Sequence, residues 1–246
     1  EVITGVKNLE KKQFDKHLLQ HNFLEKRDVM PMWISNDLIP LIEKIEKNSV
    51  KLSSISKNKR GISIASTDKK YLSEENESKS LKILRGKDIG RYKIKPVQKY
   101  LLKNSKWDNF VKIRATPKII VQNLAYRIVA TYDKQHMVLD TVNTVILNNN
   151  DFDLKYILAI LNSQLMNFYF RYVISNKAAL NIHLDEVYLG ELPIRKNQKY
   201  QKELVKLVNL ALKSNGKDKE ILQKIDDTVY KIYGISKKDQ QKISLM

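Results

Sequence analysis

Several short stretches of the chain combine basic and amide side chains of the types that contact nucleic acids. Arginine, asparagine and glutamine can pair with base edges through two hydrogen bonds, whereas lysine supplies a mobile charge for phosphates. Arg85, Lys87 and Arg91 surround a turn that contains glycine, where a phosphate can approach the backbone closely. The candidate contacts predicted from these patterns are Lys57, Lys59, Arg60, Arg85, Lys87, Arg91, Gln122, Asn123, Tyr126, Arg127, Lys177 and Asn181.

Each group of candidates also has a structural explanation. The residues around Lys57 are expected to form a flexible phosphate clamp or simply a solvated loop, and those around Arg85 would otherwise be exposed charges beside a tight turn. Gln122 to Arg127 is expected at the tip of a strand–turn–strand unit, where Asn123 would otherwise complete the turn. Lys177 and Asn181 are placed in the loop after a long helix.

Motifs for catalysis are missing. The chain lacks G-x-G-x-x-G and G-x-x-x-x-G-K-[ST], the loops that hold dinucleotides and triphosphates, and it lacks the Asn-Pro-Pro-Tyr or Asp-Pro-Pro-Tyr run of amino-methylating enzymes. His17 and His21 are four residues apart but lack the glutamate of a metalloprotease, and His136 and His183 are isolated. Surface charge or helix capping is the interpretation for Asp140, Asp151, Asp153, Asp185 and Glu186. We therefore predict no catalytic residue and no metal site.

The composition favours a globular, strongly basic domain. The 246 residues carry a net charge of +18, and 42% of them are hydrophobic, which allows a sizeable core. Eight of the 45 basic residues are arginine, so an AT-rich genome would account for part of the lysine excess. A field of this size would still attract nucleic acid at low salt. The absence of cysteine agrees with a cytoplasmic location.

The ends and the most apolar stretch indicate part of a longer, non-membrane protein. No secretory signal opens the chain, which begins at Glu1 rather than Met, so we expect it to be a piece of a larger protein. Tyr156 to Ile174 is interrupted by polar residues, among them Asn162 and Gln164, and is expected to be a buried helix rather than a membrane span.

Apolar spacing predicts an α/β (mixed α+β) fold with a twisted β-rich core, a long buried helix and a helical C-terminal tail. A helix is expected near Asn36, capped by Ser35 or Asn36, and a longer one over Asp153 to Ile174. Amphipathic helices fill the last fifty residues, with Gly234 as a C-cap. Strands are predicted at Ile62 to Ala65, Leu81 to Leu84, Lys118 to Asn123, Arg127 to Tyr132 and Val142 to Leu147, with a strand-like turn at Glu191 to Ile194.

Four segments in order resemble the C-terminal specificity domain of TaqI-like adenine-N6 DNA methyltransferases and of fused type II restriction–modification enzymes. They are Ile83-Leu84-Arg85-Gly86-Lys87-Asp88-Ile89-Gly90-Arg91-Tyr92, the pair Pro117 to Gln122 and Arg127 to Asp133, Leu154 to Ser163, and Leu192-Pro193-Ile194 followed by helices that end near Ile235. The resemblance covers roughly residues 81 to 235, and Leu154 to Ser163 is its most specific segment.

The resemblance implies a domain that recognises double-stranded DNA and contains no catalytic centre or cofactor. S-adenosylmethionine would bind in a separate N-terminal methyltransferase domain of the parent chain, which is the second expected partner beside DNA. The expected division is 1–80 as an N-terminal part of the recognition module, 81–195 as the core specificity domain and 196–246 as a helical tail.

Two other functions fit parts of the sequence. Half of a type I specificity subunit would also bind DNA, but it would need long coiled-coil helices for which the C-terminal helices look too short. A basic protein-interaction module without DNA specificity would owe its charge to codon usage. An enzyme is the weakest interpretation, because no convergent set of acid and base residues is present.

Overall fold

The computed structural model describes residues 2–8, 13–17, 34, 36–65, 67–175 and 182–244. Near the N-terminus, β1 (Val2–Asn8) and β2 (Gln13–His17) pair as an antiparallel hairpin. His17 therefore lies on a strand and not on a helix that could pair it with His21, which lies outside the described residues.

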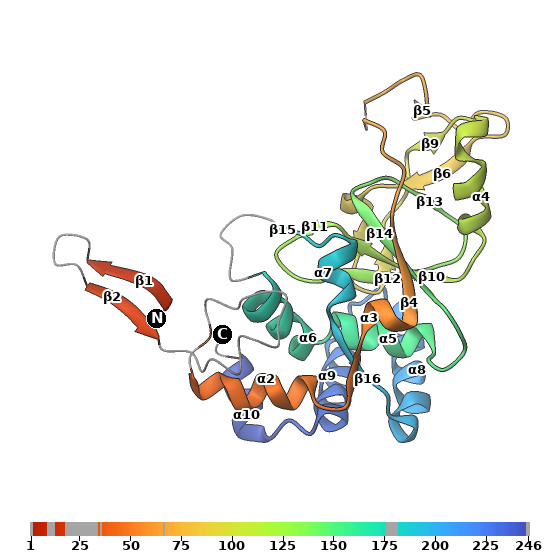
Figure 1. Cartoon of the computed structure of the whole chain (residues 1–246). Helices are drawn as coiled ribbons and strands as arrows, with labels where there is room; N and C mark the ends of the chain where they lie inside the picture. Colours follow the sequence, from red (N-terminus) through yellow and green to blue (C-terminus); the bar gives the residue numbers. More distant parts are fainter. Residues whose placement is uncertain are drawn as a thin grey trace.

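A four-stranded antiparallel sheet forms the centre of the fold (Figure 1). Its strands, in spatial order, are β12 (Ala130–Asp133), β10 (Lys118–Gln122), β14 (Val142–Leu147) and β4 (Ser56–Arg60). Successive residues of β10 point to opposite faces, as the alternation of a strand requires. Ile119 and Val121 join the large helical core, whereas Ile120 packs with Leu84 and Val142 on the other face.

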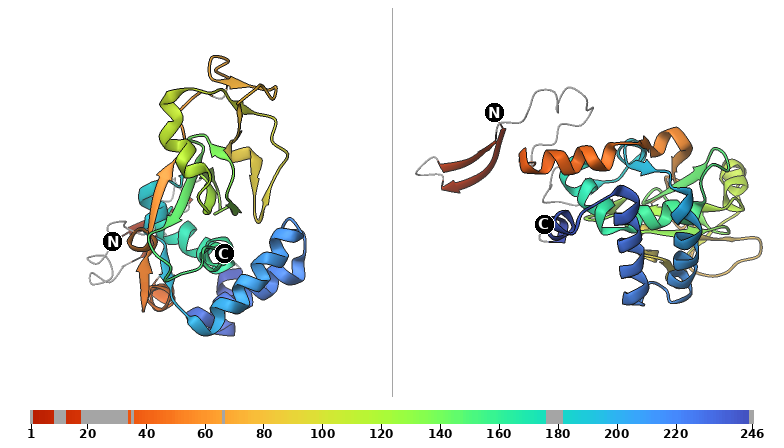
Figure 2. Two further views of the ribbon diagram at one scale, coloured as in Figure 1. Left: turned by 90° about the vertical axis from the view of Figure 1, so that its right-hand side faces the viewer. Right: turned by 90° about the horizontal axis from the view of Figure 1, so that it is seen from below.

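Helices cover one face of this sheet (Figures 1 and 2). They are α2 (Ile39–Glu46), α5 (Leu154–Asn162), α6 (Gln164–Tyr169), the π-helical turn Phe170–Ile174, α8 (Gln198–Lys213), α9 (Lys219–Tyr233) and α10 (Lys237–Ser244). The apolar faces of α8 and α9 enter the same core as α5, through Leu204 and Val208 on α8 and Val229 on α9. The C-terminal helices α8 and α9 thus pack against α5, which itself contacts β10 and β12 of the sheet.

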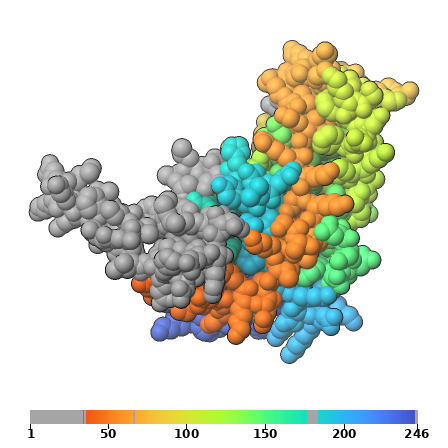
Figure 3. Space-filling model, in the orientation of Figure 1, coloured from red at the N-terminus to blue at the C-terminus, as the bar shows by residue number. Residues whose placement is uncertain are grey.

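A smaller β-lobe stands on the opposite side, at the top of Figure 1. It contains β5 (Leu72–Ser73), β6 (Leu81–Leu84), β9 (Tyr100–Leu101) and β13 (Met137–Val138), with the short helices Ser105–Trp107 and α4 (Asp108–Arg114). Ile83, Leu101 and Met137 form its buried core. In Figure 3 the segment from β4 to β5 runs up the visible face toward this lobe.

Short elements connect these layers. They are the 3-10 helix Asn36–Leu38, β3 (Ser49–Lys51), α3 (Leu52–Ile55), the 3-10 turn Gly86–Asp88, β7 (Ile89–Gly90), β8 (Lys93–Ile94), β11 (Leu124–Ala125), β15 (Ile182–His183), α7 (Glu186–Gly190) and β16 (Pro193–Arg195). β16 pairs with β3, and β11 pairs with β15.

The mixed α/β class with a helical C-terminal region is confirmed, and so are most predicted elements. Strands β6 and β14 have the predicted bounds, and Gly234 ends α9 in the left-handed conformation with φ of 66°. β12 begins at Ala130, three residues later than expected. The helix predicted near Asn36 is α2, but a 3-10 turn precedes it and no side chain caps it.

Two predictions of secondary structure were wrong. The helix expected from Asp153 to Ile174 breaks at Ser163, whose backbone is extended with ψ of 157° and whose hydroxyl caps α6 by accepting from Met166 N at 3.1 Å. The strand expected at Ile62 to Ala65 is a single bridge from Ile62 to Leu139. The polar stretch before it forms β4 instead, because β14 supplies hydrogen-bond partners to a sequence that has little apolar character.

The division of the chain into 1–80, 81–195 and 196–246 stays a prediction. β4 belongs to the central sheet together with strands of the middle segment. No helix among the described ranges has the length and apolar content needed to cross a membrane.

Candidate nucleic-acid interface

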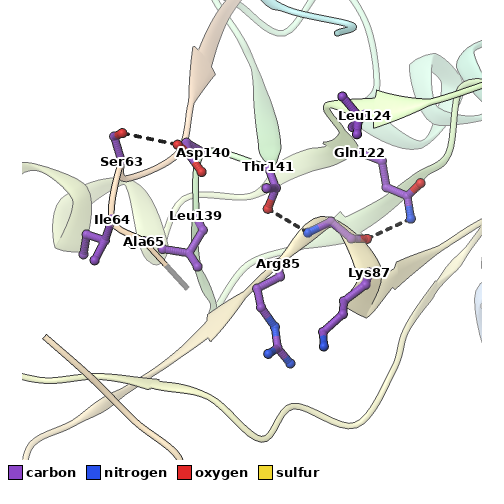
Figure 4. A pocket seen from close by; sticks show the side chains of 11 residues that line it. Ser63, Ile64, Ala65, Arg85, Lys87, Gln122, Leu124, Leu139, Asp140 and Thr141 are labelled. Atoms are coloured by element: carbon purple, nitrogen blue, oxygen red, sulfur yellow. Dashed lines mark hydrogen bonds between the residues drawn. The ribbon is translucent and has the colours of Figure 1, made fainter. Parts of the chain in front are cut away.

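A groove of about 600 Å³ opens where the central sheet meets the β-lobe (Figure 4). Its walls are the segment Ser63 to Ala65 and the turn Arg85 to Lys87, and between them runs the connection from β13 to β14. The residues that line it are Ser63, Ile64, Ala65, Arg85, Gly86, Lys87, Gln122, Leu124, Leu139, Asp140 and Thr141. Three of the predicted contacts, Arg85, Lys87 and Gln122, therefore meet in one groove.

The turn at Arg85 is held in place by two side chains that were predicted to contact DNA. The Arg85 guanidinium binds Asp88 with Nε donating to Oδ2 at 2.9 Å and a second nitrogen donating to Oδ1 at 3.1 Å. Gln122 Nε2 donates to the backbone oxygens of Gly86 at 2.7 Å and Ile89 at 2.9 Å. Arg85 and Gln122 thus hold the wall of the groove in place, while Lys87 stays exposed at its edge.

Gly86 lets this turn lie directly against the β13–β14 connection. Its N–H donates to Thr141 Oγ1 at 3.0 Å, and a Cβ at this position would lie 2.9 Å from the Thr141 carbonyl oxygen. Any larger residue would push the turn away from Thr141 and widen the groove.

Lys57, Lys59 and Arg60 lie on β4, so the flexible clamp expected there is a strand at the edge of the sheet. All three side chains are exposed. Arg60 reaches the groove: its Nε donates to the Asp140 carbonyl at 2.7 Å, and its backbone N–H donates to Glu186 Oε1 at 2.6 Å. An edge strand that carries lysines resists pairing with another chain and leaves their ammonium groups accessible to phosphates.

The predicted strand–turn–strand tip separates into buried and exposed residues. Asn123 is 1% exposed, and its Nδ2 donates to the Asp140 carbonyl at 3.1 Å. The structure therefore places Asn123 in the alternative role of supporting the turn. Tyr126 and Arg127, which follow β11 in the chain, are exposed.

Arg91 and Arg127 do not line the groove but lie near the junction with the helical tail. Arg91 donates to the Asn162 carbonyl at 2.9 Å. Burial raises the pKa of Asp226 on α9, while its hydrogen bond from Gln164 N at 2.7 Å and the charges of Arg91 and Arg127 act against that rise. Although Arg127 is exposed by its accessible surface, the protein around its guanidinium partly desolvates it and lowers its pKa, and the nearby Arg91 lowers it further. Lys177 and Asn181 lie outside the described residues.

Sequence reasoning missed a buried ionic network that joins the first residue of β10, the last residue of β12 and His136. Lys118 Nζ lies 2.7 Å from Asp133 Oδ2, and His136 Nδ1 lies 2.7 Å from Asp133 Oδ1. Burial raises the pKa of Asp133, but the hydrogen bonds from His136 and Lys118 outweigh burial and bring it to about 2. His136 is therefore not isolated, and the spacing of Asp133 and His136 around a turn was the available signal. The described part of the chain contains no group of three His, Cys, Asp or Glu that could hold a metal ion.

Most of the residues that line the groove belong to a segment that matches a known family. Residues 81–194 match the TaqI-like C-terminal specificity domain, and this range contains Arg85, Lys87, Gln122 and the β13–β14 connection. These residues make up a little less than half of the chain, and it is this segment that resembles the specificity domain. The expected resemblance is thus confirmed for this segment.

Solved structures show that the specificity domain and its surroundings share the fold of larger restriction enzymes. The type IIG restriction endonuclease BpuSI matches with a TM-score of 0.51 and 11% identity over 79% of this chain. The type IIL restriction–modification enzyme MmeI, solved in complex with DNA, matches with a TM-score of 0.52 and 12% identity over 80% of this chain. The chain spans 33% of the length of the first and 36% of the second. No protein of curated function matches its sequence.

Proposed function

We propose that this chain binds double-stranded DNA sequence-specifically and positions a separate S-adenosylmethionine-dependent adenine methyltransferase domain of the same parent protein. The observation that carries the proposal is the specificity-domain match over residues 81–194, which contains most of the residues that line the groove. The methyltransferase would carry the cofactor and extrude the target adenine, since a base inside the stack is out of reach of a catalytic site.

The distribution of charge supports a DNA partner. Lys57 and Lys59 on β4 and Lys87 at the edge of the groove are exposed, and the whole chain carries a net charge of +18. Phosphate contacts of this kind fix the register of a protein on the duplex, while hydrogen bonds to base edges provide sequence recognition. The edge strand and the groove would then divide these two tasks.

The C-terminal helices support a parent methyltransferase over half of a type I specificity subunit. α8 has 16 residues and α9 has 15, and their buried residues pack into the chain's own core. A coiled coil that holds other subunits needs an apolar seam over three or four heptads, and these faces are already covered.

The proposal is tested by titrating the purified chain with random-sequence duplexes and with single-stranded DNA between 50 and 200 mM salt, and by sequencing the retained duplexes. If about six phosphate contacts form, affinity should fall roughly 10³-fold or more over this range. Enrichment of one motif on duplex DNA is the expected result. Absence of binding at low salt would contradict the proposal and would favour a protein-interaction module.

A further inference from the structure

Asp140 gives the groove an unusual charge. It is the one acidic side chain among the described residues that line the groove, where Arg85 and Lys87 are cationic and Arg60 lies alongside. A site built for a phosphate gains nothing from a carboxylate, which repels the anion. Asp140 thus fits a neutral hydrogen-bond donor better than a phosphate.

The position of Asp140 is fixed from both sides. Its carbonyl accepts from Arg60 Nε at 2.7 Å and from Asn123 Nδ2 at 3.1 Å, and its N–H donates to the Ile62 carbonyl at 2.9 Å. These contacts tie the residue to β4 and to the end of β10. Any group that Asp140 contacts in the groove would therefore meet it in a fixed place, which lowers the entropic cost of binding.

The carboxylate itself keeps acceptor capacity. Oδ2 accepts from Ser63 Oγ at 3.2 Å, a contact drawn in Figure 4, and the nearest Arg60 nitrogen is 3.9 Å from the same oxygen. Within the described residues Oδ1 accepts no hydrogen bond, and the side chain is 27% exposed. An ionised carboxylate is an acceptor only, so its preferred ligand offers N–H groups and no adjacent acceptor.

One base has that pattern in the major groove. Cytosine presents the N4 amino donor, adenine places the N7 acceptor beside its amino group, and guanine and thymine present acceptors. We propose that Asp140 is a specificity-determining residue that accepts a hydrogen bond from the N4 amino group of one cytosine in the recognised duplex. This assignment rests on the proposed function and names one base of its target.

The test is selection of bound sequences from random duplexes by the 246-residue chain and three variants. Wild type should enrich a motif with at least one cytosine, and D140N should lose the preference at one such cytosine, roughly ten- to hundredfold, while keeping the other positions. D151N is the matched control, because Asp151 is an exposed carboxylate paired with Lys196 outside the groove. It should leave the motif unchanged.

A variant of Arg60 separates direct recognition from positioning. If Asp140 acted only by holding Arg60, R60Q would relax the same base pair as D140N; direct recognition predicts that R60Q weakens binding without that relaxation. A second measurement uses unaltered protein and replaces each cytosine of the selected motif in turn by 2-pyrimidinone, which lacks the N4 amino group. One replacement should weaken wild-type binding roughly tenfold or more, and D140N should be insensitive to it.

The outcomes distinguish the two proposals. If wild type enriches no motif, the proposed function is contradicted and the assignment of Asp140 falls with it. If wild type enriches a motif whose every cytosine is retained by D140N, or tolerates 2-pyrimidinone at every position, only the assignment of Asp140 is overturned. If D140N does not fold, tolerance of 2-pyrimidinone at every position by wild type would still overturn the assignment.

Discussion

The side-chain amide of Asn162 pairs with both backbone groups of Ala130. Asn162 Oδ1 accepts from Ala130 N at 3.1 Å, and its Nδ2 donates to Ala130 O at 2.9 Å. Ala130 starts β12, an edge strand of the central sheet, and Asn162 ends α5. The amide thus takes the place of a neighbouring strand and fixes the helix against the sheet.

Replacing Asn162 by alanine should destabilise the fold by about 3 kcal/mol, because the buried Ala130 N–H would lose its partner and a small cavity would form. Urea unfolding monitored by circular dichroism measures the change. N109A is the control: Asn109 is exposed on α4, and its loss should change stability by about 0.5 kcal/mol or less. Equal midpoints for N162A and wild type would contradict the role given to the amide.

The Lys118–Asp133–His136 network should make stability depend on pH in the acid range. The pKa of Asp133 is about 2 in the fold, below its ordinary value near 3.8, so the ionised form is the one that the fold stabilises. Its contribution, about 2 kcal/mol, is present above pH 4 and lost as the pH falls toward 2. D133N should therefore be less stable than wild type at pH 6, and the difference should shrink toward pH 2. A difference that is constant between pH 6 and pH 2 would contradict this assignment.

Gly61 sits where β4 passes the β13–β14 connection with no room for a side chain. A Cβ there would lie 2.3 Å from the Leu139 oxygen and 2.4 Å from the Val138 oxygen, both backbone atoms. G61A should destabilise the fold by about 2 kcal/mol or more. It should also weaken DNA binding, because the displaced Leu139 is followed directly by Asp140 in the groove. G234A is the comparison: its Cβ meets nothing within 4 Å, but φ of 66° makes a cost of about 1 kcal/mol. Folded G234A should bind DNA with unchanged affinity. Equal effects of G61A and G234A on binding would contradict the assignment of the groove as a DNA contact.

Lys57 and Lys59 should contact phosphates and not bases. K57Q combined with K59Q should weaken binding to all duplexes about equally and reduce the slope of log affinity against log salt by about one to two. The control is K202Q with K206Q, which removes two exposed charges from α8 on the helical layer. A change in the selected motif, with no change in salt slope, would show instead that β4 contacts base edges.

The sequence by itself determined the apolar framework. The spacing of Val, Ile and Leu located the strands β6, β10 and β14 and the helix α2. A strand or helix can bury its apolar side chains on one face only if they recur with its own period, so this signal is local. The resemblance carried by four short segments likewise identified the specificity domain over residues 81–194. Missing motifs removed the nucleotide-cradle and metalloprotease sites from consideration in the same way.

Only the tertiary structure decided which polar groups remain at the surface. Gln122 meets Gly86 across 36 positions, and Arg60 meets Asp140 across 80, so no local pattern could show that the amide braces a turn or that the carboxylate lines a groove. β4 likewise forms because β14, remote in sequence, offers it a hydrogen-bonding edge. Hydrogen-bond partners are set by contacts between distant segments, and these contacts leave Asp140 open to a ligand while they bury Asn123.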